Sequence, residues 1–132
     1  MTRAVVVNRD PAAAQAAAAI LRRAGYEVEL CAGPTADPCP VLRSLPCPLA
    51  DRADILVYDA WAGGSSDGGR RLIADVRETY PDLPVVLTSV DQQLDWVEVE
   101  GTHRVTPIVG PLDEQRLLSA VEVALADQGM AV

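Results

Sequence analysis

The residues best suited to chemistry in this sequence each stand at the end of a short apolar run. Asp59 ends the run Asp54–Asp59, and a carboxylate in that place can attack a phosphoryl donor to give an aspartyl-phosphate. A nearby hydroxyl could then hydrogen-bond the new phosphoryl oxygen. Taken alone, an Asp in that place can equally cap a turn. The residues that end the other runs are Asn8, Arg9 and Asp10, then Thr88 and Ser89, then Gly110 and Pro111.

The three cysteines form a second group with possible chemistry. Cys31, Cys39 and Cys47 follow one another at intervals of eight residues, in or beside a proline-rich stretch. They can be ordinary small apolar residues, or Cys39 and Cys47 can form a disulfide, which in the cytosol is usually redox-active. A zinc or iron–sulfur site is the third alternative. Three thiolates need a fourth ligand for zinc, the spacing is not that of a CxxC pair, and His103 lies far along the chain.

The elements that must position these residues alternate between strands and helices. Asp10 and Pro11 are typical of a helix start, an alanine-rich helix is expected from there to Arg23, and Gly25 suits a helix C-cap. Parallel strands covered on both faces are unbroken apolar runs, so the pattern predicts a doubly wound α/β fold, and such sheets bind ligands at the carboxyl ends of their strands. The expected strands are Ala4–Val7, Tyr26–Leu30, Asp54–Asp59, Leu83–Leu87 and Arg104–Val109.

Two later helices are indicated by apolar stripes, and one region breaks the alternation. Five prolines within residues 32–50 make a long helix unfavourable there, although a short turn is possible at 41–45, as is a short helix at 92–97. Pro81 should end the helix that precedes it. The expected buried stripes are Leu72, Ile73, Val76 and Tyr80 in one helix, and Leu117, Leu118, Val121 and Leu125 in the last.

Composition narrows the class of protein. A chain of 132 residues with 49% hydrophobic residues fits a single domain over residues 1–132. The net charge of −8 argues against a nucleic-acid surface, which would need clustered basic residues on one face. No apolar run approaches the roughly 20 residues of a membrane span, and neither a signal peptide nor a lipidation motif is visible. We therefore expect a cytoplasmic protein that binds neither nucleic acid nor membranes.

Over nearly the whole chain, the order and spacing of the segments resemble the receiver domain of bacterial response regulators. The similar segments are AVVVNRDP, ILVYDA, DGGRRLIADVRETYPDLPVVLTS and GPLDEQRLLSAVEVAL. The resemblance implies a CheY-like, flavodoxin-like five-stranded parallel sheet with strand order 2-1-3-4-5, in which residues 32–50 replace the second helix by a Pro/Cys-rich loop. It also implies that Asp59 is the phospho-acceptor, Thr88 the switch hydroxyl and Pro111 the cis-prolyl position after the family's Lys.

Where this sequence differs from the family's pattern, the differences change the charge of the expected phosphorylation pocket. Asn8 and Arg9 stand where the family has an acidic pair, and Gly110 stands where it has the Lys that grips the phosphoryl group. Mg²⁺ prefers carboxylate oxygens, and phosphoryl transfer depends on positioning and charge neutralisation. We therefore expect weak or absent Mg²⁺ binding, no other cofactor, and a guanidinium of Arg9 that pairs with Asp59. Asp10 is expected to cap the first helix.

These residues predict an atypical receiver that acts as a signalling interaction module rather than an enzyme. Its expected partner is a signalling protein, either a histidine kinase or an output protein, and a homodimer is possible. The alternatives are a conventional receiver that accepts phosphate on Asp59, and a thiol or metal sensor on the same scaffold. A flavodoxin-type carrier would need a Thr/Ser-rich phosphate loop where Pro11 and a run of Ala stand.

Overall fold

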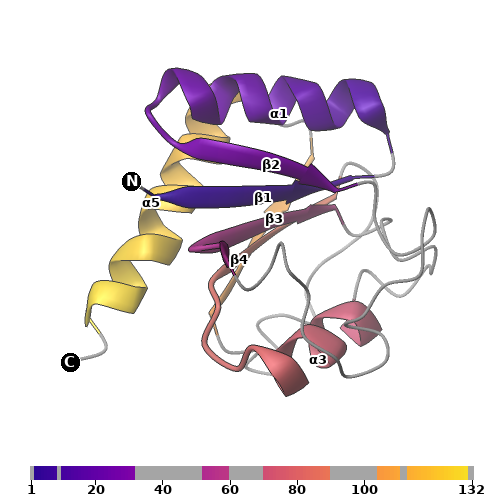
Figure 1. Cartoon of the computed structure of the whole chain (residues 1–132), viewed down its shortest axis with the longest axis vertical. Helices are drawn as coiled ribbons and strands as arrows, with labels where there is room; N and C mark the ends of the chain where they lie inside the picture. The colour runs from indigo at the N-terminus through magenta and orange to yellow at the C-terminus, as the bar shows by residue number, and fades with distance from the viewer. Residues whose placement is uncertain are drawn as a thin grey trace.

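The computed structural model is a five-stranded parallel sheet with helices on both faces (Figure 1). It describes residues 2–8, 10–31, 52–59, 70–89, 104–110 and 113–130. The sheet order is β2-β1-β3-β4-β5, which confirms the predicted doubly wound fold. The elements are β1 (Arg3–Val7), α1 (Pro11–Arg23), β2 (Glu27–Cys31), β3 (Ile55–Asp59), α3 (Arg70–Thr79), β4 (Val85–Ser89), β5 (Val105–Val109) and α5 (Glu114–Met130).

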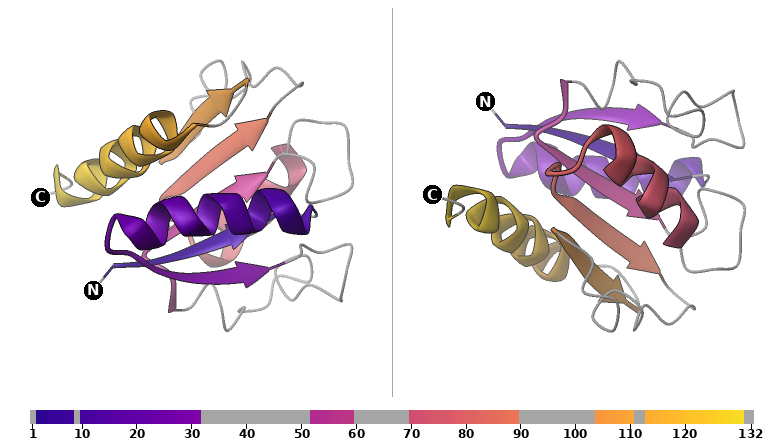
Figure 2. Two further views of the ribbon diagram at one scale, coloured as in Figure 1. Left: turned by 90° about the horizontal axis from the view of Figure 1, so that it is seen from above. Right: turned by 90° about the horizontal axis from the view of Figure 1, so that it is seen from below.

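The sheet is buried on both faces by side chains that alternate along each strand. Helices α1 and α5 cover one face and α3 lies against the other (Figure 2). Val6, Val57 and Val86 belong to the core on the α1/α5 side. Their strand neighbours Val7 and Leu87 belong to the core on the α3 side, as the two-residue period of a strand requires.

Helix α1 begins and ends as its sequence predicts. The Asp10 carboxylate accepts a hydrogen bond from the amide of Ala12 at 3.0 Å, and Pro11 takes the first helical position. At the other end, Gly25 has φ +99°, its amide donates to the Arg22 carbonyl at 3.1 Å, and the Tyr26 amide donates to the Leu21 carbonyl at 3.1 Å. This pair of bonds is the Schellman motif, which needs a left-handed residue at its turn.

The later helices carry the predicted stripes. In α3, Ile73 and Val76 are buried, and Tyr80 packs partly buried against the same core just beyond the helix end, while the side chain of Leu72 is not among those described. In α5, Leu117 and Val121 are fully buried, with Leu118 and Leu125 packed against the core at its edge. Within the described residues, no helix combines the length and apolarity that crossing a membrane requires.

Some predicted bounds are wrong by one or two residues, and others cannot be compared. β4 runs from Val85 to Ser89 instead of 83–87, and β2 from Glu27 to Cys31 instead of 26–30. The reason is that hydrogen bonding to a neighbouring strand defines a strand: β4 pairs with β5 as far as Ser89 and Val109. The possible turn at 41–45, the possible helix at 92–97 and the Pro/Cys-rich segment 32–50 lie outside the described residues.

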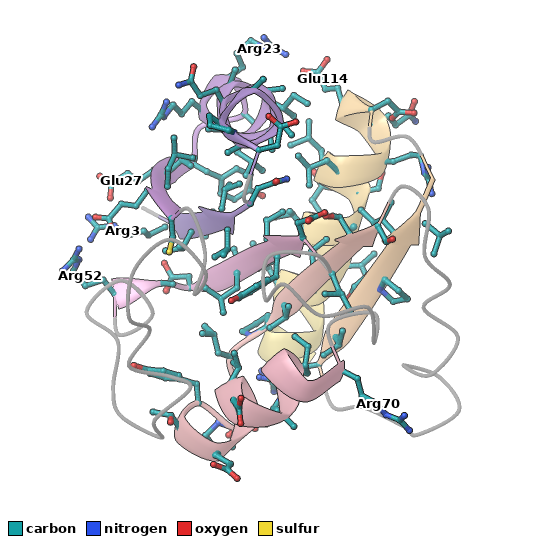
Figure 3. All side chains as sticks on the ribbon, turned by 90° about the vertical axis from the view of Figure 1, so that its right-hand side faces the viewer. Arg3, Arg23, Glu27, Arg52, Arg70 and Glu114 are labelled. Carbon is teal, nitrogen blue, oxygen red and sulfur yellow. The ribbon has the colours of Figure 1, made fainter. Side chains whose placement is uncertain are left out.

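Exposed ion pairs join neighbouring elements at the surface. Arg23 and Glu114 meet at 3.4 Å between α1 and α5, and Arg3 meets Glu27 at 2.9 Å across β1 and β2 (Figure 3). A third pair, Arg52 with Glu29 at 3.0 Å, lies next to the second. Exposed pairs contribute little to stability, so the buried sheet faces hold the fold together.

We predict that Gly25→Ala lowers the free energy of unfolding by about 1 kcal/mol, because a Cβ disfavours the left-handed backbone of the Schellman turn. Nothing lies within 4 Å of the position that the new Cβ would take, so crowding adds nothing to this cost. Urea denaturation measures it. Gly25→Asn, which tolerates this backbone better, should lose less; equal losses would refute the conformational explanation.

Candidate functional site

Asn8, Asp59 and Thr88 lie side by side on one face of the sheet, at the carboxyl ends of β1, β3 and β4. Asp59 and Thr88 are direct partners in the β3–β4 ladder. Val7 pairs with Tyr58, so Asn8 and Asp59 follow next on the two adjoining strands. Each of the three is two residues beyond a core residue on the α1/α5 side, namely Val6, Val57 or Val86. The pleat therefore directs all three side chains to that face.

Ser89 has a different environment from Thr88. It follows Leu87 by two residues and so belongs to the α3 side of the sheet, and it is only 1% exposed. Thr88 is half-buried, and its hydroxyl donates to the Tyr58 carbonyl at 3.5 Å, a long and therefore weak hydrogen bond. Of the two predicted hydroxyls, Thr88 is the one on the same face as the carboxylate.

A small pocket of about 80 Å³ opens at this corner of the sheet. Its base is apolar, formed by strand valines and by Ala13 and Ala17 of α1. Alanine side chains leave space between this helix and the strand ends, because they extend no further than Cβ. The polar lining is Asn8, Asp59, Thr88, Ser89 and Gly110.

Asn8 and Asp10 are engaged in building the turn from β1 into α1. The Asn8 side-chain oxygen accepts from the Asp10 amide at 2.9 Å, and the Asp10 carboxylate accepts from the Ala12 amide. The first is an Asx turn and the second a helix N-cap. The side-chain oxygen of Asn8 and one carboxylate oxygen of Asp10 therefore already accept hydrogen bonds from backbone amides. The predicted capping role of Asp10 is confirmed.

Gly110 forms the β5 side of the pocket in a backbone conformation that favours glycine. Its φ is +98°, and its amide donates to the Ser89 carbonyl at 2.8 Å, which extends the β4–β5 pairing by one residue. A Cβ at this position would lie 3.5 Å from Nη1 of Arg116, in the first turn of α5. Arg116 was not among the residues predicted from the sequence. No motif marks it, and only the turn between β5 and α5 brings it to this corner.

Other predicted site residues are placed elsewhere or lie outside the described residues. Cys31 ends β2, where its carbonyl accepts from the Asn8 amide at 3.1 Å, and its side chain packs partly buried against the core on the α3 side. The structure does not describe Arg9, Pro111, Cys39 or Cys47, so the Arg9–Asp59 pair and both cysteine hypotheses remain predictions.

Among the described residues, the pocket places one carboxylate beside an amide. At the pocket, Asp59 supplies the carboxylate, while the oxygen of Asn8 accepts an amide and Asp10 caps α1. A hard cation of this kind is held mainly by carboxylate oxygens and water. Across the described part of the chain, no three His, Cys, Asp or Glu side chains group in a way that could hold a metal ion.

Comparison with solved structures relates this architecture to a known fold. The response regulator receiver domain protein of Clostridium thermocellum superposes with a TM-score of 0.73 at 14% identity, over 100% of both chains. The CheY-like receiver domain protein of Methanospirillum hungatei JF-1 gives 0.75 at 17%, over 100% of this chain and 99% of that one. The chain has the receiver-domain fold.

A third receiver agrees with the first two. The receiver domain of NtrX from Brucella abortus gives a TM-score of 0.71 at 24% identity, over 93% of this chain and 98% of that one. By sequence, no family model matches the chain and no curated protein is similar to it. At these identities the comparison establishes the receiver fold alone.

We predict that Asp10→Ala destabilises the protein by about 1 kcal/mol, because the Ala12 amide loses its partner at the start of α1. Thermal unfolding in EDTA measures this without any contribution from a metal. Asp10→Ser keeps a capping oxygen and should recover most of the loss. Failure of Ser to recover stability would show that Asp10 does something other than cap.

We also predict that Gly110→Lys, which introduces the family's residue, destabilises the protein by about 1 kcal/mol or more. The cause is the left-handed backbone, together with a Cβ placed against the Arg116 guanidinium. Chemical denaturation measures the change, with Gly110→Asn as the milder control. An unchanged unfolding midpoint for Gly110→Lys would mean that the β5–α5 turn adapts freely.

Proposed function

We propose that this protein is a signal-transduction module of the receiver type that acts by binding a signalling partner, without conventional Mg²⁺-dependent phosphorylation of Asp59. The observation that carries the proposal is the row formed by Asn8, Asp59 and Thr88 at the carboxyl ends of adjacent strands. The row has the carboxylate and hydroxyl of a receiver pocket, but an amide stands beside the carboxylate.

The charge balance of that row supports the second half of the proposal. Phosphoryl transfer to a carboxylate brings several negative oxygens together, and catalysis consists mainly of neutralising and positioning them. An amide oxygen at Asn8 lacks the formal charge that recruits a hard cation. It is also already hydrogen-bonded to the Asp10 amide. Transfer from a small phospho-donor should therefore be slow.

A signalling role without catalysis needs a surface for the partner. Exposed large hydrophobic side chains among the described residues include Val109 of β5, at 40%, and Val123 of α5, at 53%. We propose a histidine kinase, an output protein or a second copy of the chain as the partner. Size-exclusion chromatography distinguishes the last of these.

Conventional phosphorylation on Asp59 is the second candidate function, and the direct pairing of Asp59 with Thr88 favours it.

We predict that incubation with acetyl phosphate and Mg²⁺ leaves the intact mass of the protein unchanged, because Asn8 places an amide, which carries no formal charge to recruit the metal, beside Asp59. Mass spectrometry after rapid quenching measures the adduct. An adduct of one phosphoryl group that disappears in Asp59→Ala would overturn the proposal in favour of the conventional receiver.

A gain-of-function variant sharpens this test. Asn8→Asp adds a carboxylate directly beside Asp59, so it should increase Mg²⁺ affinity and allow measurable phosphorylation. Gln15→Glu makes the same change of charge on an exposed position of α1 and should do neither. If Asn8→Asp and Gln15→Glu behave alike, the amide at position 8 is not what limits the reaction.

A further inference from the structure

Strand β2 forms one edge of the sheet that the structure describes (Figure 2). The Glu27 amide donates to the Thr2 carbonyl at 3.0 Å, so Glu27 directs its backbone groups toward β1. The direction of these groups alternates from residue to residue along a strand that pairs on one side. The amide and carbonyl groups of Val28 and Leu30 therefore point away from the sheet.

Such an edge is a template for pairing with another strand, because its backbone donors and acceptors stand in a row. Leu30 adds an apolar side chain that is 40% exposed. Charged side chains often protect edge strands, but the two glutamates of β2 are paired. Glu27 meets Arg3 at 2.9 Å, and Glu29 meets Arg52 at 3.0 Å. These pairs reduce the repulsion that the glutamates would exert on the same strand of a second copy.

Arg22, in the last turn of α1, covers part of this edge. Its Nη2 donates to the Val28 carbonyl at 3.2 Å. An antiparallel strand that added to the edge would need both the amide and the carbonyl of Val28, because hydrogen-bonded residues in such a pair exchange both bonds. The incoming strand would therefore have to displace the guanidinium and break a charge-assisted hydrogen bond.

We propose that Arg22 prevents this chain from associating through β2, because its guanidinium occupies the carbonyl that β2 of a second copy would use. A second copy fits this edge because a two-fold axis sets two identical edges antiparallel to each other, with Leu30 of both copies at the contact. Within the described residues, none that lines the pocket belongs to β2. The protection of the edge is therefore independent of the chemistry at Asp59.

The test replaces Arg22 by Ala and measures sedimentation velocity over a series of protein concentrations. Arg22→Ala should associate at a concentration about tenfold lower than the wild-type protein, as expected when pairing no longer breaks a charge-assisted hydrogen bond. The amides of Val28 and Leu30 should exchange rapidly with solvent in dilute protein and become protected as Arg22→Ala associates. Adding Leu30→Lys to Arg22→Ala should reverse the association, since a lysine on an edge strand opposes pairing.

The matched control is Arg23→Ala. Arg23 is the next residue in the last turn of α1, and it pairs with Glu114 of α5 instead of a strand edge. Arg23→Ala makes the same change of charge at the same helix end and should associate as the wild-type protein does. The proposal is overturned if Arg22→Ala associates no more than Arg23→Ala, or if it associates without protecting the amides of Val28 and Leu30. The second outcome would mean that copies meet through another surface.

Discussion

The pairing register of the parallel strands is the constraint on which the site depends. Because side chains alternate along a strand, a shift of one residue would send a side chain to the opposite face. The observed register sets Asp59 beside Thr88 and brings Asn8 alongside. All three then face α1 and α5, where alanines leave room for a pocket. The buried valines that hold this register thereby also decide which polar groups meet.

The two ends of the sheet differ in structure. At the amino ends, the half-buried Arg77 donates to the carbonyls of Tyr80 and Arg104 at 3.0 and 3.1 Å, which ties the end of α3 to the start of β5. Desolvation lowers the pKa of this guanidinium. At the carboxyl ends, polar groups line a pocket instead.

Charge at the pocket is arranged differently from what the resemblance to receivers would suggest. An amide replaces a carboxylate on the β1 side, and a glycine replaces a cation on the β5 side. On the β5 side, Arg116 of α5 lies against the same glycine, and its guanidinium donates to the Val109 carbonyl.

The sequence by itself determined the elements and their caps, because these depend on neighbours within a few residues. Asp10 with Pro11, Gly25 and the apolar stripes of α3 and α5 act locally, and unbroken apolar runs indicate a parallel sheet. Only the tertiary structure decided that β4 extends to Ser89 and that Arg116 lies against Gly110. Those outcomes follow from strand register and from the packing of α5 beside β5, which no local pattern encodes.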